Sequence, residues 1–295
     1  MDIVIGLGQA GCNIADSFAN YKQYEIYKID AGLEALKETS FGNFPQDGIY
    51  NMPKQNTPEA YEECCPDMTY FFKDVKGEVL FVFGASGDIS GAALRILEYL
   101  KHCDVNILYV QPDIELLPER KKLQEKATYY ILQEYTRSAI FKRLFLASTP
   151  AVEEHLGSLP LVGYFDKINE IIASTLHMMN VYNHIDSVTD TFHEPYETAR
   201  ISTFGLVDID DGTIKTFFPL DKVREMRYYY AINNKHLETD GDLFKKIKQQ
   251  VKDKSKEGIK TSYGVYSTDY KENYGYAVCY SSTVQTREED DVQPG

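Results

Sequence analysis

The chain has 295 residues, of which 43% are hydrophobic and 26% charged, so it can form one large or two medium globular domains. Its net charge of −14 argues against direct nucleic-acid binding, because neutralising phosphates requires clustered lysine and arginine. We expect a cytoplasmic protein with reduced cysteines, because there is no signal peptide, no apolar run of membrane-spanning length and an odd count of five cysteines.

The first predicted elements are a short buried strand at Asp2–Ile5, a turn, and a helix from about Cys12 to Ala19. The turn reads Gly6-Leu7-Gly8-Gln9-Ala10-Gly11, which is a G-x-G-x-x-G sequence. The next predicted strand, Tyr24–Ile29, ends in Asp30, roughly where a dinucleotide-binding fold places the acid that binds a ribose. This segment alone favours an NAD-dependent oxidoreductase.

A second strand, turn and helix follow between Val79 and Leu100. Val79–Phe83 is a continuous apolar run, typical of a buried strand in a parallel sheet. Three glycines and two serines lie in Gly84–Gly91, and apolar residues then recur at helical spacing. Such a turn presents backbone N–H groups and the positive end of a helix to an anion. Two such turns favour a phosphate chain held from several sides, and a tight turn without a ligand is the alternative.

The remaining elements of the first half are assigned from shorter patterns. Thr57 is a candidate N-cap with Pro58 in the first helical turn. A buried strand at Val105–Val110 precedes a charged segment that reads as a solvated helix face, and a further short strand is predicted at Leu144–Ala147. An amphipathic helix runs from about Phe165 to Tyr182.

The second half has a different pattern. It predicts strands at about Arg200–Ile209 and Met226–Ile232, a helix at Asp242–Val251, and a hairpin of Thr261–Ser267 and Tyr274–Tyr280. We therefore predict an α/β architecture with four parts. These are a doubly wound, mostly parallel sheet domain at 1–163, a central connecting helix at 164–185, a smaller α+β domain at 186–282 and a disordered acidic tail at 283–295.

Taken together, these segments resemble the tubulin/FtsZ superfamily of polymerising GTPases over nearly the whole chain. The short chain with an acidic tail is most similar to the phage-encoded tubulin-like proteins, which would place it in a host cytoplasm. The resemblance implies GTP or GDP and Mg²⁺ as ligands, and a head-to-tail homopolymer.

The resemblance also assigns nucleotide-binding loops. Gly8–Asn13 looks like the first phosphate loop, Asp30–Leu36 like the loop after the second strand, and Asn56–Glu59 like the γ-phosphate-side loop. Gly84–Gly91 stands where the family has its glycine/threonine loop, with Asp88 and Ile89 departing from the pattern. The phosphate-side residues expected to bind nucleotide are Gly8, Gln9, Gly11, Cys12, Asn13, Asp30, Asn56, Ala85, Ser86, Gly87, Asp88, Ser90 and Gly91.

Sugar and base recognition is expected from two further segments. Pro112–Arg120 is similar to the family's sugar-binding loop, which assigns Glu115 and Arg120 to the ribose. Phe165 and Asn169 lie four residues apart and so share a helix face. The family uses such a pair to stack on guanine and to hydrogen-bond its edge, for which an amide supplies both a donor and an acceptor.

The family's hydrolytic acids lie after the long helix and reach the nucleotide of the neighbouring subunit. Here the loop contains Asp186 and Asp190, four apart where the family spaces them by three, and Glu194 is a reserve candidate. A carboxylate can orient the water that attacks the γ-phosphate, and helix capping by Asp186 is the alternative. No G-x-x-x-x-G-K-[ST] sequence is present, so backbone amides and Mg²⁺ are expected to hold the phosphates.

The sequence thus predicts a GTPase that assembles head to tail and hydrolyses GTP at the subunit interface. An NAD-dependent oxidoreductase is one alternative, and a degenerate, non-hydrolysing tubulin-like structural protein, suggested by Asp88 and Ile89, is another. The acidic tail is interpreted as an adaptor-binding segment, as a partner for a basic groove of a neighbouring subunit, or as a solubilising tail.

Overall fold

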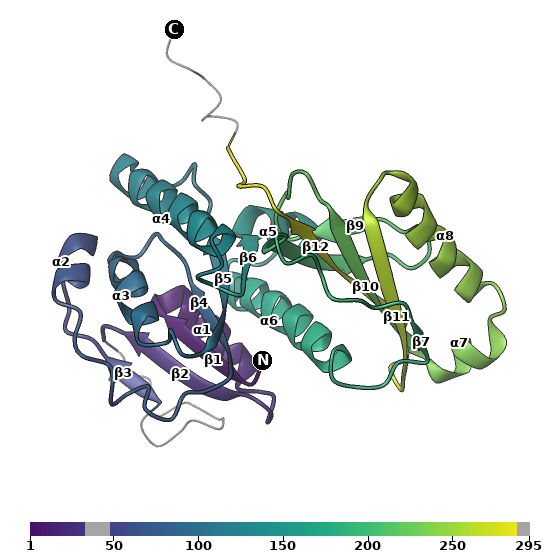
Figure 1. Cartoon of the computed structure of the whole chain (residues 1–295), viewed down its shortest axis with the longest axis horizontal. Coiled ribbons are helices and arrows are strands. Elements are labelled where there is room, and N and C mark those ends of the chain that lie inside the picture. The colour runs from purple at the N-terminus through teal and green to yellow at the C-terminus, as the bar shows by residue number, and fades with distance from the viewer. Residues whose placement is uncertain (33–47, 288–295) are drawn as a thin grey trace, which may run out of the picture.

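The computed structural model describes residues 1–32 and 48–287 (Figure 1). The elements of the first half, up to the long helix α6, are β1 (Ile3–Leu7), α1 (Gly8–Phe18), β2 (Glu25–Asp30), β3 (Ile49–Asn51), α2 (Pro58–Glu63), β4 (Glu78–Phe83), the 3-10 helix η2 (Asp88–Ala92), α3 (Ala93–Glu98), β5 (Asp104–Gln111), α4 (Glu119–Arg137), β6 (Arg143–Ser148), α5 (Thr149–Leu156) and α6 (Tyr164–Tyr182). Those of the second half are β7 (Thr189–Asp190), β8 (Ile201–Val207), β9 (Ile214–Thr216), β10 (Glu225–Asn233), α7 (Asn234–Thr239), α8 (Leu243–Lys256), β11 (Lys260–Thr268) and β12 (Tyr274–Ser281).

The first half is a doubly wound parallel sheet, as predicted. Its strand order is β3-β2-β1-β4-β5-β6, and all five pairings are parallel. All five residues of β1 are buried, because helices cover both faces. Apolar residues of α1 and α6 pack on one face, and those of α3 and α4 pack on the other.

The second half continues the same sheet rather than forming a separate one. β8 pairs in parallel with β6 at two positions, Leu144 with Ile201 and Phe145 with Ser202. Beyond β8 the order is β12-β10-β11-β7, with parallel and antiparallel neighbours.

The predicted hairpin of β11 and β12 is wrong. β10 lies between them, parallel to β11 and antiparallel to β12. The reason is the helical crossover: α8 packs its buried Leu243, Ile247 and Val251 under the sheet and returns the chain parallel to β10. The short turn after β11 then leads to the other side of β10, where both faces of that strand are buried.

Helix α6 joins the two halves and lies between them (Figure 1). Ile168 and Ile172 pack with residues of α1, and Tyr182 stacks on Tyr266 of β11 with ring centroids 4.5 Å apart. Its 19 residues correspond to a length of about 28 Å. The helix therefore sets the distance between whatever lies at its two ends.

The chain after β12 differs in part from the predicted disordered tail. The structure describes it to Arg287, and Gln285 is only 2% exposed because it packs against α4. Residues 288–295 lie outside the described residues. No helix within the described ranges is long and apolar enough to cross a membrane.

Candidate functional site

The carboxyl ends of β1 and β4 mark the point where the strand order reverses. β1 has β2 on one side and β4 on the other, and the register pairs Leu7 with Phe83 at the ends of the two strands. Ligands of open α/β sheets bind in the crevice outside such a reversal point. The loops that begin at Gly8 and Gly84 therefore start side by side at the position best suited to a ligand.

Glycine contacts hold three of the predicted phosphate segments together. A Cβ on Gly8, whose φ is +70°, would lie 2.9 Å from Cγ2 of Ile89. A Cβ on Gly11 would lie 2.2 Å from the carbonyl oxygen of Val82, and one on Gly91 would lie 2.0 Å from that of Pro58. The first loop, the Gly84–Gly91 loop and the start of α2 are thus in close contact.

The first helix offers free backbone donors at this crevice. α1 begins after Leu7 with no side-chain cap in the described chain, whereas Thr57 caps α2 by accepting a hydrogen bond of 3.1 Å from the N–H of Ala60. An uncapped helix start leaves N–H groups and positive partial charge available to an anion. Gln9 in this first turn is exposed and Asn13 is half-buried.

Two of the residues predicted to bind nucleotide, Cys12 and Asp30, have side chains that are bonded within the protein. Cys12 is 1% exposed, and its thiol donates to the carbonyl oxygens of Gly6 and Ile29 at 3.5 and 3.6 Å. Burial raises the pKa of this thiol to about 12, so it is a packed, protonated group. The Asp30 carboxylate accepts from the N–H of Ala31 at 2.8 Å, and burial raises its pKa. The remainder of that predicted loop, from Leu33, lies outside the described residues.

Helix α4 supplies two residues to the phosphate loop that sequence reasoning missed. Lys121 Nζ lies 2.5 Å from Oδ1 of Asp88, so a cation compensates the carboxylate that would otherwise repel phosphate. The Gln124 amide donates to the carbonyl oxygen of Gly87 and to the hydroxyl of Ser90, both at 2.9 Å. The sequence signal for Lys121 is the charged run 119–122, which by itself is typical of a solvated helix face.

The residues predicted for the sugar and the base, and Asn56 of the third phosphate segment, differ in exposure. Asn56 and Glu115 are exposed, and Arg120 lies 4.0 Å from Glu59 in the first turn of α2. Asn169 is 7% exposed on the inner face of α6, and the Phe165 ring is 64% exposed beside Tyr164. An exposed aromatic ring at the start of a helix is free to stack on a planar ligand.

The predicted hydrolytic acids gather at the other end of α6. Asp186, Asp190 and Glu194 line one pocket of about 560 Å³ that also contains Arg227 and His193. The carboxylate of Asp190 accepts hydrogen bonds from the hydroxyl of Ser187 and, at 3.3 Å, from the N–H of Phe192. Asp186 accepts none from the described residues. Within one chain, these acids therefore lie about the length of α6 away from the phosphate loops.

Two side chains of β10 hold this acidic loop, and the sequence did not identify them. The guanidinium of Arg227 donates to the carbonyl oxygen of His193 and, at 3.5 Å, to Oδ1 of Asn183. Glu225 is fully buried, lies 2.8 Å from Nε2 of His193 and accepts from the N–H of Tyr196 at 3.1 Å. The sequence signal is a Glu-x-Arg pair on one face of a strand otherwise rich in tyrosine.

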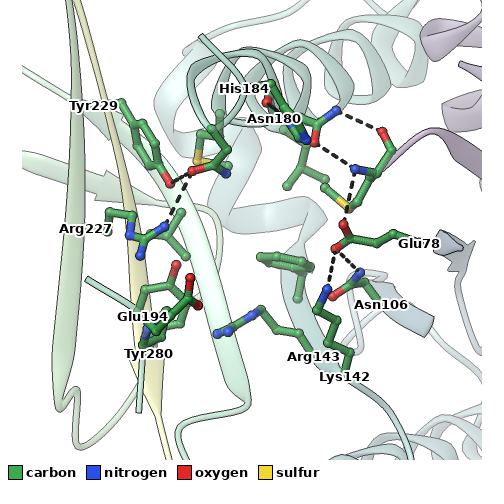
Figure 2. A pocket seen from close by; sticks show the side chains of 17 residues that line it. Glu78, Asn106, Lys142, Arg143, Asn180, His184, Glu194, Arg227, Tyr229 and Tyr280 are labelled. Carbon is green, nitrogen blue, oxygen red and sulfur yellow. Dashed lines mark hydrogen bonds and ion pairs between the residues drawn. The ribbon is translucent and has the colours of Figure 1, made fainter. Parts of the chain in front are cut away.

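A second pocket of about 270 Å³ lies between the two halves and α6 (Figure 2). On one side Glu78 accepts from Lys142 at 3.2 Å and from Asn106 at 2.9 Å. On the other side are Arg227 and Glu194, which also line the acidic pocket (Figure 2). Because Glu78 begins β4, this cavity is at the amino edge of the sheet and is separate from the phosphate crevice.

No group of three or more His, Cys, Asp or Glu side chains within residues 1–32 and 48–287 is arranged to hold a metal ion. Mg²⁺ commonly binds through one or two carboxylates together with substrate phosphates and water. The groups at the crevice would therefore hold Mg²⁺ only together with the oxygens of a bound phosphate chain.

Solved structures of three proteins are similar to this one over most of their length. TubZ of Bacillus thuringiensis serovar israelensis, in GDP-form protofilaments, has a TM-score of 0.71 at 14% identity, covering 95% of this chain and 87% of that one. CetZ from Methanosaeta thermophila has a TM-score of 0.67 at 13% identity, covering 95% of this chain and 86% of that one. An empty FtsZ dimer from M. jannaschii has a TM-score of 0.66 at 11% identity, covering 95% of this chain and 87% of that one. No protein-family model and no curated protein matches the sequence. The chain therefore has the fold of FtsZ, TubZ and CetZ, as the sequence predicts, and the narrower likeness to phage-encoded members stays a prediction.

Proposed function

We propose that the chain is a GTPase of the tubulin/FtsZ type that polymerises head to tail and hydrolyses GTP between subunits. The observation that supports this proposal is that the glycine-packed crevice and the loop with Asp186 and Asp190 lie at opposite ends of α6. The phosphate crevice lies at its start and the acidic loop follows its end, about 28 Å away. A second copy stacked end to end brings the crevice and the loop together, and such a heterologous contact extends into a filament.

GTP is assigned to the crevice outside β1 and β4. The backbone of the first loop and of Gly84–Gly91 would hold the phosphates, and Lys121 would add the positive charge. Glu115 and Arg120 are assigned to the ribose, and Phe165 and Asn169 to the guanine. Mg²⁺ would bind the phosphate oxygens together with water and would neutralise charge that develops during phosphoryl transfer.

Exposed apolar side chains at both ends of α6 support stacking. Leu161 and Val162 precede the helix with 91% and 92% of their surface exposed. Ile185 and Val188 in the acidic loop are 48% and 59% exposed. A head-to-tail contact would remove both groups from water, which favours association by about 25 cal/mol for each Å² buried.

Asp186 is the carboxylate we assign to the attacking water. Its oxygens accept no hydrogen bond within the described chain, so it can orient a water in the neighbouring site. Asp190 is already bonded to Ser187 and to the backbone of Phe192, so it shapes the loop. The predicted change is a fall in turnover of about 100-fold or more in Asp186→Asn, with GTP affinity unchanged. Asp190→Asn should lower turnover less, and Asp74→Asn on the surface should have no effect.

The test of the shared site is the GTP turnover per subunit as a function of protein concentration. Turnover should rise steeply at the concentration where electron microscopy first shows filaments, because the acid arrives with the neighbour. Equal turnover per subunit below and above that concentration would contradict the proposal. A rise in melting temperature with NADH and none with GTP would favour the oxidoreductase instead.

The degenerate, non-hydrolysing alternative rested on Asp88 and Ile89. Lys121 neutralises the first, and the second is 7% exposed with its side chain against Gly8, so neither blocks the crevice. Filaments that form without any GTP turnover would restore this alternative.

The acidic tail is assigned to a basic partner, either an adaptor or a neighbouring subunit. A shallow pocket of about 400 Å³ near Thr283 is lined by Lys222, Arg224 and Lys260, which gives a complementary surface on the chain itself. Ending the chain at Arg287 should raise the critical concentration for assembly. An unchanged critical concentration would leave the adaptor as the partner and remove the neighbouring subunit.

A further inference from the structure

The chain returns to α4 after its last strand. The N–H of Gln285 donates to Oε1 of Gln133 at 2.6 Å, and Nε2 of Gln133 donates to the carbonyl oxygen of Gln285 at 3.3 Å. Gln285 also accepts from the N–H of Asp221 at 2.6 Å. The segment is therefore fixed to α4 by a reciprocal pair of hydrogen bonds and to the second half by a third.

Two residues later the chain reaches a buried carboxylate. Glu125 is fully buried, and a guanidinium nitrogen of Arg287 pairs with its Oε2. Its Oε1 accepts from the hydroxyl of Tyr109 at 2.6 Å and from the amide of Gln111 at 3.3 Å. The guanidinium also lies 4.7 Å from the centre of the Tyr129 ring, a cation–π contact.

Removing the cation from this cluster would leave a buried charge without compensation. Breaking a buried ion pair by deleting one partner is costly, because the other charge stays out of water. Burial and the carboxylate of Glu125 raise the pKa of Tyr109 well above its usual range, so the tyrosine remains a donor and cannot supply positive charge. Without Arg287, the carboxylate of Glu125 has to move toward water and take α4 with it.

The cluster is directly connected to both walls of the candidate nucleotide site. Gln124, the residue before Glu125, holds the backbone of Gly87 and the hydroxyl of Ser90, and Lys121 one turn earlier holds Asp88. Gln111 ends β5, from which the chain continues to Glu115. A shift of Glu125 therefore displaces the phosphate loop and the start of the sugar loop together.

We propose that Arg287 is a positioning residue of the nucleotide site, which it holds in its binding geometry through Glu125 and α4. This inference rests on the proposed function only for the identity of the ligand. It makes Arg287, 162 residues from its partner in the chain, part of the site's support.

Affinity is measured with a fluorescent GTP analogue at protein concentrations below assembly. Arg287→Gln should weaken binding about tenfold, and Arg287→Lys, which keeps the charge, should recover most of it. The double variant Glu125→Gln with Arg287→Gln should bind better than Arg287→Gln alone, because it no longer buries an unpaired charge. Two matched controls should bind like the wild type: Arg137→Gln, an exposed arginine on the same helix, and a chain that ends at Arg287.

Amide hydrogen exchange without nucleotide gives a second readout that does not depend on GTP. Arg287→Gln should accelerate exchange in residues 84–91 and in the first two turns of α4, and leave α8 unchanged. Wild-type exchange in those segments, or wild-type affinity in folded Arg287→Gln, would overturn the inference. If the wild type itself binds no GTP analogue, the proposed function fails, and the exchange pattern alone decides whether Arg287 supports the loop.

Discussion

The two ends of α6 are built in different ways. At its start, the crevice is shaped by close contacts at three glycines, where an added Cβ would meet a neighbouring atom within 3 Å: backbone at Gly11 and Gly91, and the Ile89 side chain at Gly8. At its end, the acidic loop is held by the pairing of β7 with β11 and, beyond Asp190, by the side chains of Arg227 and Glu225 of β10. The first end has no room for a Cβ at its contact points, whereas the second combines one short strand pairing with specific side-chain contacts.

This difference fits the two tasks we propose. A phosphate chain needs fixed backbone donors at short distance, which a glycine-packed crevice provides before the ligand arrives. An acid that acts in a neighbouring subunit must adjust to that neighbour, and Asp186, which precedes the paired residues of β7 and accepts no hydrogen bond from the described residues, can do so at lower cost. Substitutions at the two ends should therefore separate ligand binding from turnover.

The largest expected change, a loss of stability, comes from Gly91→Ala. The new Cβ would lie 2.0 Å from a backbone oxygen of Pro58, so the loop has to move, at a cost of about 3 kcal/mol or more in the free energy of unfolding. GTP affinity should fall with it. Gly87→Ala in the same loop places its Cβ 3.8 Å from Ile89, and chemical denaturation should show a change within about 0.5 kcal/mol. Equal destabilisation by both variants would contradict the backbone-built crevice.

A second prediction concerns the middle of α6, on which both ends depend. His177 is buried, stacked 3.5 Å from Tyr21 and hydrogen-bonded to Tyr24 at 3.1 Å, and burial lowers its pKa to about 4. His177 binds a proton more tightly in the unfolded chain than in the folded one. The stability that the neutral, buried imidazole contributes is therefore complete above pH 6.5 and is lost as the pH falls toward 4. The loss amounts to at most about 3 kcal/mol.

Urea unfolding at pH 7 and pH 5 measures this loss. His177→Gln should show a smaller decrease between the two pH values than the wild type, because the remaining titrating groups are common to both. The same decrease in both proteins would mean that His177 is not the group responsible.

Phe165→Ala should affect the first end of α6 alone. Because the ring is 64% exposed, the free energy of unfolding should change by less than about 0.5 kcal/mol. Loss of stacking on the base should weaken GTP binding by about 1 kcal/mol or somewhat more in an equilibrium titration. Unchanged affinity would place the guanine elsewhere.

The smallest effect is expected at the second end, from Arg227→Gln. The loop loses its contact with the carbonyl oxygen of His193, and a slightly displaced acid should lower turnover per subunit about threefold. GTP binding below the assembly concentration should match the wild type, and Arg137→Gln, an exposed arginine on α4, serves as the control for turnover. Weaker GTP binding in Arg227→Gln would show that the two ends are not independent.

The sequence by itself determined the parallel half of the sheet, the two glycine-rich turns and the long helix. These features are local: an apolar run, a turn whose residues lack side chains and a 3.6-residue repeat are each contained within some 20 residues. Gly8, Gly11 and Gly91 could be assigned to one crevice because parallel strands end at the same edge of a sheet.

Only the tertiary structure decided the position of β10 between β11 and β12, and the partners of the charged side chains. Lys121 meets Asp88 across 33 residues and Arg287 meets Glu125 across 162, separations at which sequence spacing carries no information about contact. The polar segment after β12 read as a disordered tail for the same reason, because its order comes from hydrogen bonds to Gln133 on a distant helix. Polar residues form such contacts only where the fold places a buried partner, and that placement is a property of the assembled chain.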